Sequence, residues 1–206
     1  MSAATVEYSQ HVHETESMTL RETADHIMER LPGYRAEIIG GILTVTPAPD
    51  GPHSRALTTL MLPFLAAGLH DGETAVLQGI GVWLPGGPEE YAIPDLAVVD
   101  ADFDEHVSNG TNHDPAVFRL VLEVTSSNYN NDLKLKTVAY AKARIPVYVI
   151  VDRKHNRVHV LTEPGEEGYG SHRVHAPGER AVIPESVGAG VELDVAAVLK
   201  AGRART

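Results

Sequence analysis

Two acidic side chains in this sequence lie inside otherwise apolar segments. Asp95 belongs to the run IPDL at 93–96, and Glu123 belongs to the run LVLEV at 120–124. An ionised carboxylate is rarely buried in such a run unless it is paired or bound to a cation, because removing it from water is costly. On adjacent strands the two carboxylates would form a divalent-metal site, and hard oxygen ligands favour Mg²⁺ or Mn²⁺ over zinc. The alternative is that each acid marks a strand end at the surface.

A lysine follows the second acid at a spacing that could direct its ammonium group to the same place. Asp132, Lys136 and Tyr140 are four residues apart in succession. On a helix this spacing places all three side chains on one face. The alternative is a plain ion pair between Asp132 and Lys136 on a solvated helix, which would contribute only ~0.3–0.5 kcal/mol.

The elements that must position these side chains follow from hydrophobic periodicity and from turn residues. Thr19 and Glu22 have the spacing of a capping box, and Asp194 could cap a last helix. The expected helices cover 20–31, 53–70, 132–143 and 194–200. The expected strands cover 34–39, 42–46, 74–84, 91–99, 118–125, 147–151 and 157–161, with two or three short ones within 169–191 and a polar loop at 100–115.

The order of these elements predicts an α/β fold, with a central mixed β-sheet flanked by helices. The helix at 132–143 connects two strands as the crossover of a βαβ unit would. A chain of 206 residues with 43% hydrophobic side chains can bury one substantial core. We therefore expect one domain at 19–200, between a disordered leader at 1–18 and a flexible tail at 201–206.

Composition excludes several classes of function. The chain has no cysteine, so disulfide frameworks and cysteine-based zinc sites are absent, which suits a reducing compartment. The first residues lack the pattern of a signal peptide, and no segment approaches the ~20 apolar residues of a membrane span. These features predict a cytoplasmic protein without membrane contact.

The net charge of −11 opposes binding to nucleic acid, because affinity for phosphate backbones comes from lysine and arginine. The distribution of charge is uneven, since 134–157 is locally basic. Its basic residues are Lys134, Lys136, Lys142, Arg144, Arg153, Lys154 and Arg157, against the single acid Asp152. The alternative is that these residues form ordinary solvated surfaces.

Several separate signatures between about residues 19 and 163 resemble the PD-(D/E)xK nuclease superfamily, and within it the Uma-two family of restriction-endonuclease-like proteins. The signatures are Glu37-Ile38-Ile39-Gly40, His53 at the start of a long helix, Pro94-Asp95, Leu122-Glu123-Val124 with Ser126, Asp132 to Lys136 with Tyr140, and IPVYVIVD at 145–152. The resemblance implies a restriction-endonuclease-like fold, metal-dependent hydrolysis of DNA phosphodiester bonds, and a homodimer.

The resemblance also implies roles for individual residues. Asp95, Glu123 and the carbonyl group of Val124 would hold Mg²⁺ or Mn²⁺. The lysine position two residues beyond the acid is Thr125 here, so Lys136 would supply the catalytic amine from the helix. His53 and Glu37 are further catalytic candidates: His53 could contact a phosphate or transfer a proton, and Glu37 could bind the metal through water. Structural roles for these two residues are the alternative.

Two other classes of protein compete with a nuclease. A catalytically inactive member would use the same fold to bind nucleic acid or a protein partner. A small cupin-type β-barrel metal protein is suggested by the eleven histidines. The histidines that suggest it are His11, His13, His155, His159, His172 and His175. The barrel is the weaker alternative, because no strand carries two histidines and a carboxylate together.

Overall fold

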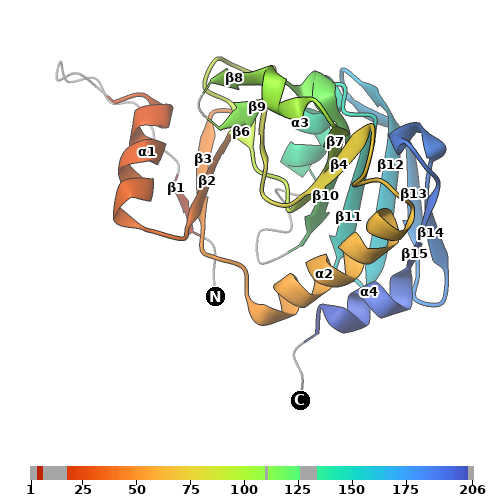
Figure 1. Cartoon of the computed structure of the whole chain (residues 1–206). Coiled ribbons are helices and arrows are strands. Elements are labelled where there is room, and N and C mark those ends of the chain that lie inside the picture. The colour runs from red at the N-terminus through yellow and green to blue at the C-terminus, as the bar shows by residue number, and fades with distance from the viewer. Residues whose placement is uncertain (1–3, 7–17, 110, 126–133, 204–206) are drawn as a thin grey trace.

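Two β-sheets form the framework of the computed structural model, which describes residues 4–6, 18–109, 111–125 and 134–203 (Figure 1). The seven-stranded sheet has the order β1 (Ala4–Val6), β3 (Ile42–Thr46), β2 (Arg35–Ile39), β6 (Tyr91–Ala92), β5 (Gly81–Trp83), β9 (Asn112–His113) and β8 (Val107–Asn109). The six-stranded sheet has the order β13 (Gly168–His175), β12 (Arg157–Gly165), β11 (Val147–Asp152), β10 (Phe118–Val124), β7 (Leu96–Asp100) and β4 (Thr74–Leu77).

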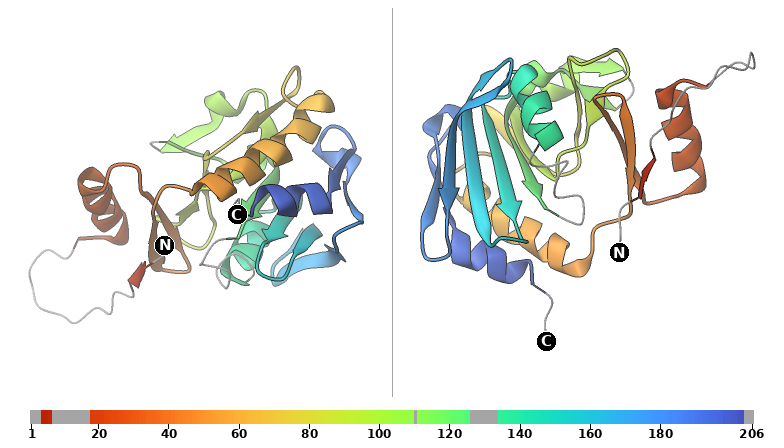
Figure 2. Two further views of the ribbon diagram at one scale, coloured as in Figure 1. Left: turned by 90° about the horizontal axis from the view of Figure 1, so that it is seen from below. Right: turned by 180° about the vertical axis from the view of Figure 1, so that it is seen from behind.

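Helices cover both faces of the six-stranded sheet (Figure 2). The helices are α1 (Leu20–Arg30), α2 (Gly51–Ala66), α3 (Lys136–Lys142) and α4 (Val195–Ala201), and a hairpin of β14 (Arg180–Ile183) and β15 (Val191–Asp194) completes the fold. One core lies between the sheet and α2, α4 and the hairpin. A second core lies between the opposite face, α3 and part of the seven-stranded sheet, while α1 packs on β2 and β3. The predicted α/β architecture is confirmed.

The six-stranded sheet is mixed because one pair of its strands is parallel. β10 and β11 run parallel with α3 between them in sequence, and the other pairs in this sheet are antiparallel. Side chains of β10 alternate between the two cores: Leu120 and Leu122 pack towards α2 and α4, and Val121 packs towards α3. The same alternation places Glu123 on the α3 side.

Local capping explains where three of the helices begin. Thr19 and Glu22 form the predicted capping box at α1, since each side chain bonds the other residue's backbone N–H. Asp50 accepts the N–H of His53 at 2.8 Å and starts α2 at Gly51. Asp194 caps α4 as predicted, by accepting the N–H of Ala197.

Several predicted boundaries were wrong, and turn residues explain two of them. The predicted strands at 74–84 and 91–99 each divide into two strands that belong to different sheets. Pro94 has no N–H to donate to a sheet, and Gly79 adopts a φ of 65° that favours glycine. The predicted loop at 100–115 contains β8, β9 and short 3-10 turns. α2 covers Gly51–Ala66, and Asp132 lies outside the described residues.

Two short elements lie near the ends of the chain. Ala4–Val6, inside the expected leader at 1–18, forms β1 and pairs with β3. The helix α4 continues to Ala201, the first residue of the expected tail at 201–206. No helix within the described part of the chain is long and apolar enough to cross a membrane.

Candidate active site

Asp95 lies where the chain passes from one sheet to the other. β6 ends at Ala92 in the seven-stranded sheet, and β7 begins at Leu96 in the six-stranded sheet. Leu96 pairs with Leu122 of the antiparallel neighbour β10, so continuing this register brings Asp95 level with Glu123. As predicted, 118–125 and the second half of 91–99 form adjacent strands, and both acids lie at the same end of the pair.

Asp95 is buried, with 5% of its surface exposed, and it is surrounded by donors. Its Oδ2 accepts the N–H of Val124 at 2.9 Å, while its Oδ1 lies 3.1 Å from both Arg35 Nη2 and His53 Nε2. Burial alone would raise the pKa of Asp95. The contact and charge of His53, the charge of Arg35 and the Val124 N–H outweigh burial, so this pKa lies below its usual value.

Glu123 is equally buried and accepts two hydrogen bonds from α3. Lys136 Nζ donates to Oε1 of Glu123 at 2.7 Å, and the Tyr140 hydroxyl donates to the same oxygen at 2.8 Å. The side chains of Lys136 and Glu123 are only 7% and 5% exposed. Lys136 and Tyr140 therefore lie on the same face of α3, as their four-residue spacing predicts.

Glu37 brings a third carboxylate to this cluster, from the opposite sheet. Its Oε1 lies 2.9 Å from Lys136 Nζ and accepts the N–H of Ile93 at 2.7 Å. The Lys136 ammonium therefore lies between Glu37 of β2 and Glu123 of β10. Glu37 was a catalytic candidate in the sequence, but its ion pair with Lys136 joins two segments about 100 residues apart and could not be predicted from local patterns.

Arg35 is a site residue that the sequence analysis did not single out. Its guanidinium contacts Asp95, and its side chain is 28% exposed. From the sequence alone, an arginine at the start of a strand is predicted to lie on the surface. The one available signal is its position two residues before Glu37, because alternate residues of a strand share a face.

Thr125 occupies the position where the superfamily pattern has its lysine. Its side chain is buried and donates a hydrogen bond to the Val151 carbonyl at 3.1 Å. The same hydroxyl oxygen accepts the N–H of Arg153 at 3.0 Å. Thr125 thus ties the end of β10 to the end of β11, and the amine of the cluster comes from α3.

The donor atoms of the cluster fit a hard divalent cation. Asp95 and Glu123 supply carboxylate oxygens, which Mg²⁺ and Mn²⁺ prefer. Within the described ranges, no group of three or more His, Cys, Asp or Glu residues could hold a metal ion. A cation here would therefore depend on the two carboxylates, a backbone carbonyl such as that of Val124, and water. This set suits Mg²⁺, which usually keeps several water ligands in proteins.

Among the described residues, the remaining histidines do not form the metal site of a barrel. His159 Nδ1 and His172 Nε2 lie 2.8 Å apart on neighbouring strands, and His155 Nδ1 lies 2.9 Å from the buried Asp152. His11 and His13 lie outside the described residues. Because the fold consists of layered sheets and helices, the cupin-type alternative was wrong.

Arg144 and Arg153, both in the basic segment at 134–157, lie at opposite ends of β11. Arg144, at one end, pairs with Glu166 on the surface. At the other end, Arg153 and Arg157 follow β11, and Arg203 Nη2 donates to Asn156 Oδ1 at 3.0 Å. Arg55 Nη2 donates to the Arg203 carbonyl at 2.9 Å. We call Arg55, Arg153, Arg157 and Arg203 the basic edge; it adjoins the end of β10 through Thr125.

The fold and this cluster together define a restriction-endonuclease-like protein, with buried carboxylates at one end of two adjacent strands and a lysine against them. The particular family follows from the sequence comparison. The family model Uma2, described as "Putative restriction endonuclease", matches residues 24–196, and the chain belongs to this family.

A solved structure supports the same fold. The crystal structure of a "putative nuclease belonging to DUF820" from Anabaena variabilis matches with a TM-score of 0.65 and 16% sequence identity. The match covers 91% of this chain and 100% of that chain. No curated protein matches the sequence.

Proposed function

We propose that this protein is a metal-dependent endonuclease that hydrolyses phosphodiester bonds in DNA. The observation that carries the proposal is the buried cluster in which Lys136 Nζ contacts Glu123 and Glu37 beside Asp95. Burying a lysine among carboxylates costs desolvation free energy that pairing offsets only in part, and such clusters concentrate at functional sites. Membership of the Uma2 family supports a nuclease in particular.

In the proposed mechanism the carboxylates and the lysine have different tasks. Asp95, Glu123 and the Val124 carbonyl would hold Mg²⁺ or Mn²⁺, which supplies an activated water and neutralises charge on the phosphate. The Lys136 ammonium would orient the attacking water and offset the charge that develops on the phosphoryl oxygens.

The other polar residues would position these groups. His53 and Arg35 fix Oδ1 of Asp95, and Tyr140 fixes Oε1 of Glu123. Glu37 holds the Lys136 ammonium from the opposite sheet. Held in this way, the reactive groups would need little reorganisation when the substrate binds.

The basic edge offers a route for the DNA backbone despite the net charge of −11. Arg153 and Arg157 are carried by the turn that Thr125 ties to the end of β10. Local clusters of arginine near a catalytic centre can bind phosphates even when the whole chain is acidic.

The proposal is tested by incubating purified protein with plasmid and single-stranded DNA in Mg²⁺, Mn²⁺ or EDTA. We expect cleavage in the presence of metal, and its loss in Asp95→Asn, Glu123→Gln and Lys136→Met. Lys142→Met is the matched control, because Lys142 is an exposed lysine on the same helix. Equal cleavage by all four variants would assign the activity to a contaminant. Light scattering of the same samples tests the proposed homodimer.

A catalytically inactive binding module is the second candidate, and one observation favours it. Arg35 and the Val124 N–H contact Asp95, and Lys136 and the Tyr140 hydroxyl contact Glu123. These partners compensate both carboxylates without a metal ion. Such a protein would bind DNA with unchanged affinity in EDTA and in Mn²⁺, and would show no turnover.

A further inference from the structure

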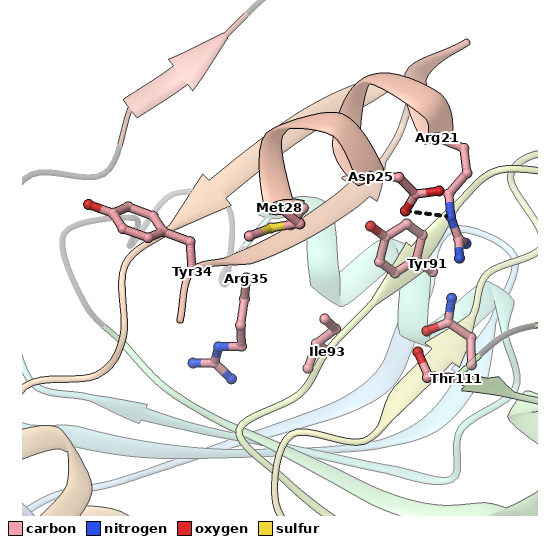
Figure 3. Close-up of a pocket in the computed structure, with 10 residues that line it drawn as sticks. Arg21, Asp25, Met28, Tyr34, Arg35, Tyr91, Ile93 and Thr111 are labelled. Atoms are coloured by element: carbon pink, nitrogen blue, oxygen red, sulfur yellow. Dashed lines mark ion pairs between the residues drawn. The ribbon is translucent and has the colours of Figure 1, made fainter. Parts of the chain in front are cut away.

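A pocket of about 200 Å³ lies between α1 and the seven-stranded sheet. Figure 3 shows Arg21 and Met28 of α1 on one side, Tyr91 and Ile93 on the other, and Arg35 on the strand that follows the helix. Its remaining lining residues are Asp25, Tyr34, Ala36, Thr111 and Asn112. This pocket is separate from the carboxylate cluster but borders it.

The pocket exists because β2 and β6 separate soon after they meet. Their registered pairing is limited to Ile38 and Tyr91. Beyond this pair the Glu37 side chain accepts the N–H of Ile93, so a side chain takes the place of a backbone hydrogen bond. Arg35 on β2 and Ile93 after β6 therefore become opposite walls of an opening in the sheet.

Hydrogen-bond donors without acceptors gather around this opening. Arg21 Nη1, Arg35 Nε and Asn112 Nδ2 are buried and have no hydrogen-bond partner among the described residues. Asn112 is only 2% exposed, and a Cβ at Gly81 would lie 1.9 Å from its Oδ1, so glycine is required for Asn112 to take this position. Buried donors normally have acceptors, and three unsatisfied ones in one pocket point to an acceptor-rich ligand.

Aromatic rings add a flat apolar element beside these donors. The Arg21 guanidinium lies 5.0 Å from the centroid of the Tyr91 ring and 5.6 Å from that of Trp83. The buried Nε1 of Trp83 also has no partner among the described residues. Of the described residues that line the pocket, Asp25 alone is acidic, and it pairs with Arg21 at 3.4 Å. The chemistry suits a planar ligand that carries oxygen or nitrogen acceptors.

Arg35 connects the pocket to the proposed catalytic site. Its Nη2 contacts Asp95 at 3.1 Å, while its Nε is one of the unpartnered donors. Ile93 lines the pocket and is two residues from Asp95. A ligand in the pocket would therefore lie directly beside the group that is proposed to bind the metal.

We propose that this pocket binds an unpaired nucleotide of the substrate, next to the phosphate that is cleaved. The inference rests on the proposed nuclease function and narrows its substrate to single-stranded or locally unpaired DNA. A volume of about 200 Å³ is below that of pockets for drug-sized ligands, ~300–1,000 Å³, and suits one nucleotide ring system. A base within a stacked duplex cannot enter such a pocket, whereas an unstacked base can.

Trp83 gives a direct test, because it is the only tryptophan of the chain. Its fluorescence is measured in EDTA during titration with deoxynucleoside monophosphates, deoxynucleosides and inorganic phosphate. We expect the nucleotides to quench Trp83 more strongly and at lower concentration than phosphate. Arg21→Gln and Asn112→Asp should weaken this binding by about tenfold or more, because each removes a donor to the ligand. Arg30→Gln, an exposed arginine of the same helix, should bind as the wild type does.

The outcomes separate this inference from the proposed function. Absence of quenching, equal binding of phosphate alone, or unchanged affinity in Arg21→Gln would overturn the nucleotide pocket even if the protein cleaves DNA. Quenching that depends on Arg21 would support the pocket even if no cleavage occurs. In active protein, Arg21→Gln should raise KM for single-stranded DNA with little change in kcat. Preference for intact duplex over single strands would contradict the inference.

Discussion

Lys136 Nζ lies 2.7 Å from Oε1 of Glu123, and the two side chains are almost completely buried. The same nitrogen lies 2.9 Å from Oε1 of Glu37 on the other sheet. A single ammonium group therefore compensates two buried carboxylates. Removing the ammonium would leave both carboxylates buried without this compensating charge. An uncompensated buried charge is what makes a broken buried ion pair destabilising.

The first prediction concerns Lys136→Met. In EDTA we expect the free energy of unfolding to fall by about 3–5 kcal/mol, the usual cost of breaking a buried ion pair. Divalent cations should restore more stability to this variant than to the wild type, because they replace the missing positive charge. Urea unfolding with EDTA or Mn²⁺ measures both effects, with Lys142→Met as control. An equal response of variant and wild type to Mn²⁺ would argue against a cation site beside Lys136.

The second prediction concerns the Tyr140 hydroxyl, which donates to Glu123 at 2.8 Å. Tyr140→Phe should lose about 1.5–3 kcal/mol of stability, as expected for a hydrogen bond to a charged group. Tyr169→Phe is the matched control, because its hydroxyl donates to the neutral Ile145 carbonyl. Only Tyr140→Phe should lower kcat, by less than Lys136→Met does. A kinetic loss of equal size in both tyrosine variants would show that the effect is not specific to Glu123.

The third prediction is a loss of stability in mild acid that originates at His159 and His172. Burial holds the pKa of both rings below the usual value, and the charge of His172 lowers that of His159 further, against the attraction of Asp152. The unfolded chain therefore binds protons first as the pH falls below about 6.5. Stability should be greatest above this pH and should decrease below it.

Urea unfolding at neutral pH and in mild acid measures this effect. His172→Gln should make the decrease between the two conditions smaller, because one of the two rings with a lowered pKa can no longer take up a proton. A decrease of the same size in wild type and variant would place the acid sensitivity elsewhere in the fold.

The fourth prediction concerns the basic edge. Arg157→Gln should weaken DNA binding in EDTA and lower the slope of log K against log salt by ~1, the value for one lost phosphate contact. Arg180→Gln serves as control, because Arg180 pairs with Glu192 at 3.9 Å and lies away from the basic edge. Arg180 is beside the start of α4, whereas Arg203 of the basic edge follows the end of this helix. Equal slopes in wild type and Arg157→Gln would remove this turn from the DNA path.

Local sequence signals predicted the features that depend on neighbouring residues. The capping box of Thr19 and Glu22 is a local hydrogen-bond pattern, and the spacing of Lys136 and Tyr140 fixes a shared helix face whatever the helix packs against. Asp95 and Glu123 could be singled out as candidate site residues, because burying an ionised carboxylate within an apolar run costs free energy in any fold.

Features that depend on which segments meet could not be predicted in this way. Both halves of 91–99 are apolar, so nothing in their composition assigns them to different sheets. Arg35 becomes a site residue only because β2 lies across from Asp95. Arg144 and Arg153 belong to one basic segment of the sequence, yet the six residues of β11 at ~3.3 Å each lie between them and span ~20 Å.

The chain changes sheets repeatedly before it reaches β10, between β3 and β4, β4 and β5, β6 and β7, β7 and β8, and β9 and β10. The strands of the two sheets therefore alternate along the sequence, and neither sheet is built from one continuous segment. Contacts between distant segments must be made early, which slows folding relative to a chain with mostly local contacts. The two sheets should melt in one cooperative transition, and no fragment that ends between β4 and β9 should retain either sheet intact.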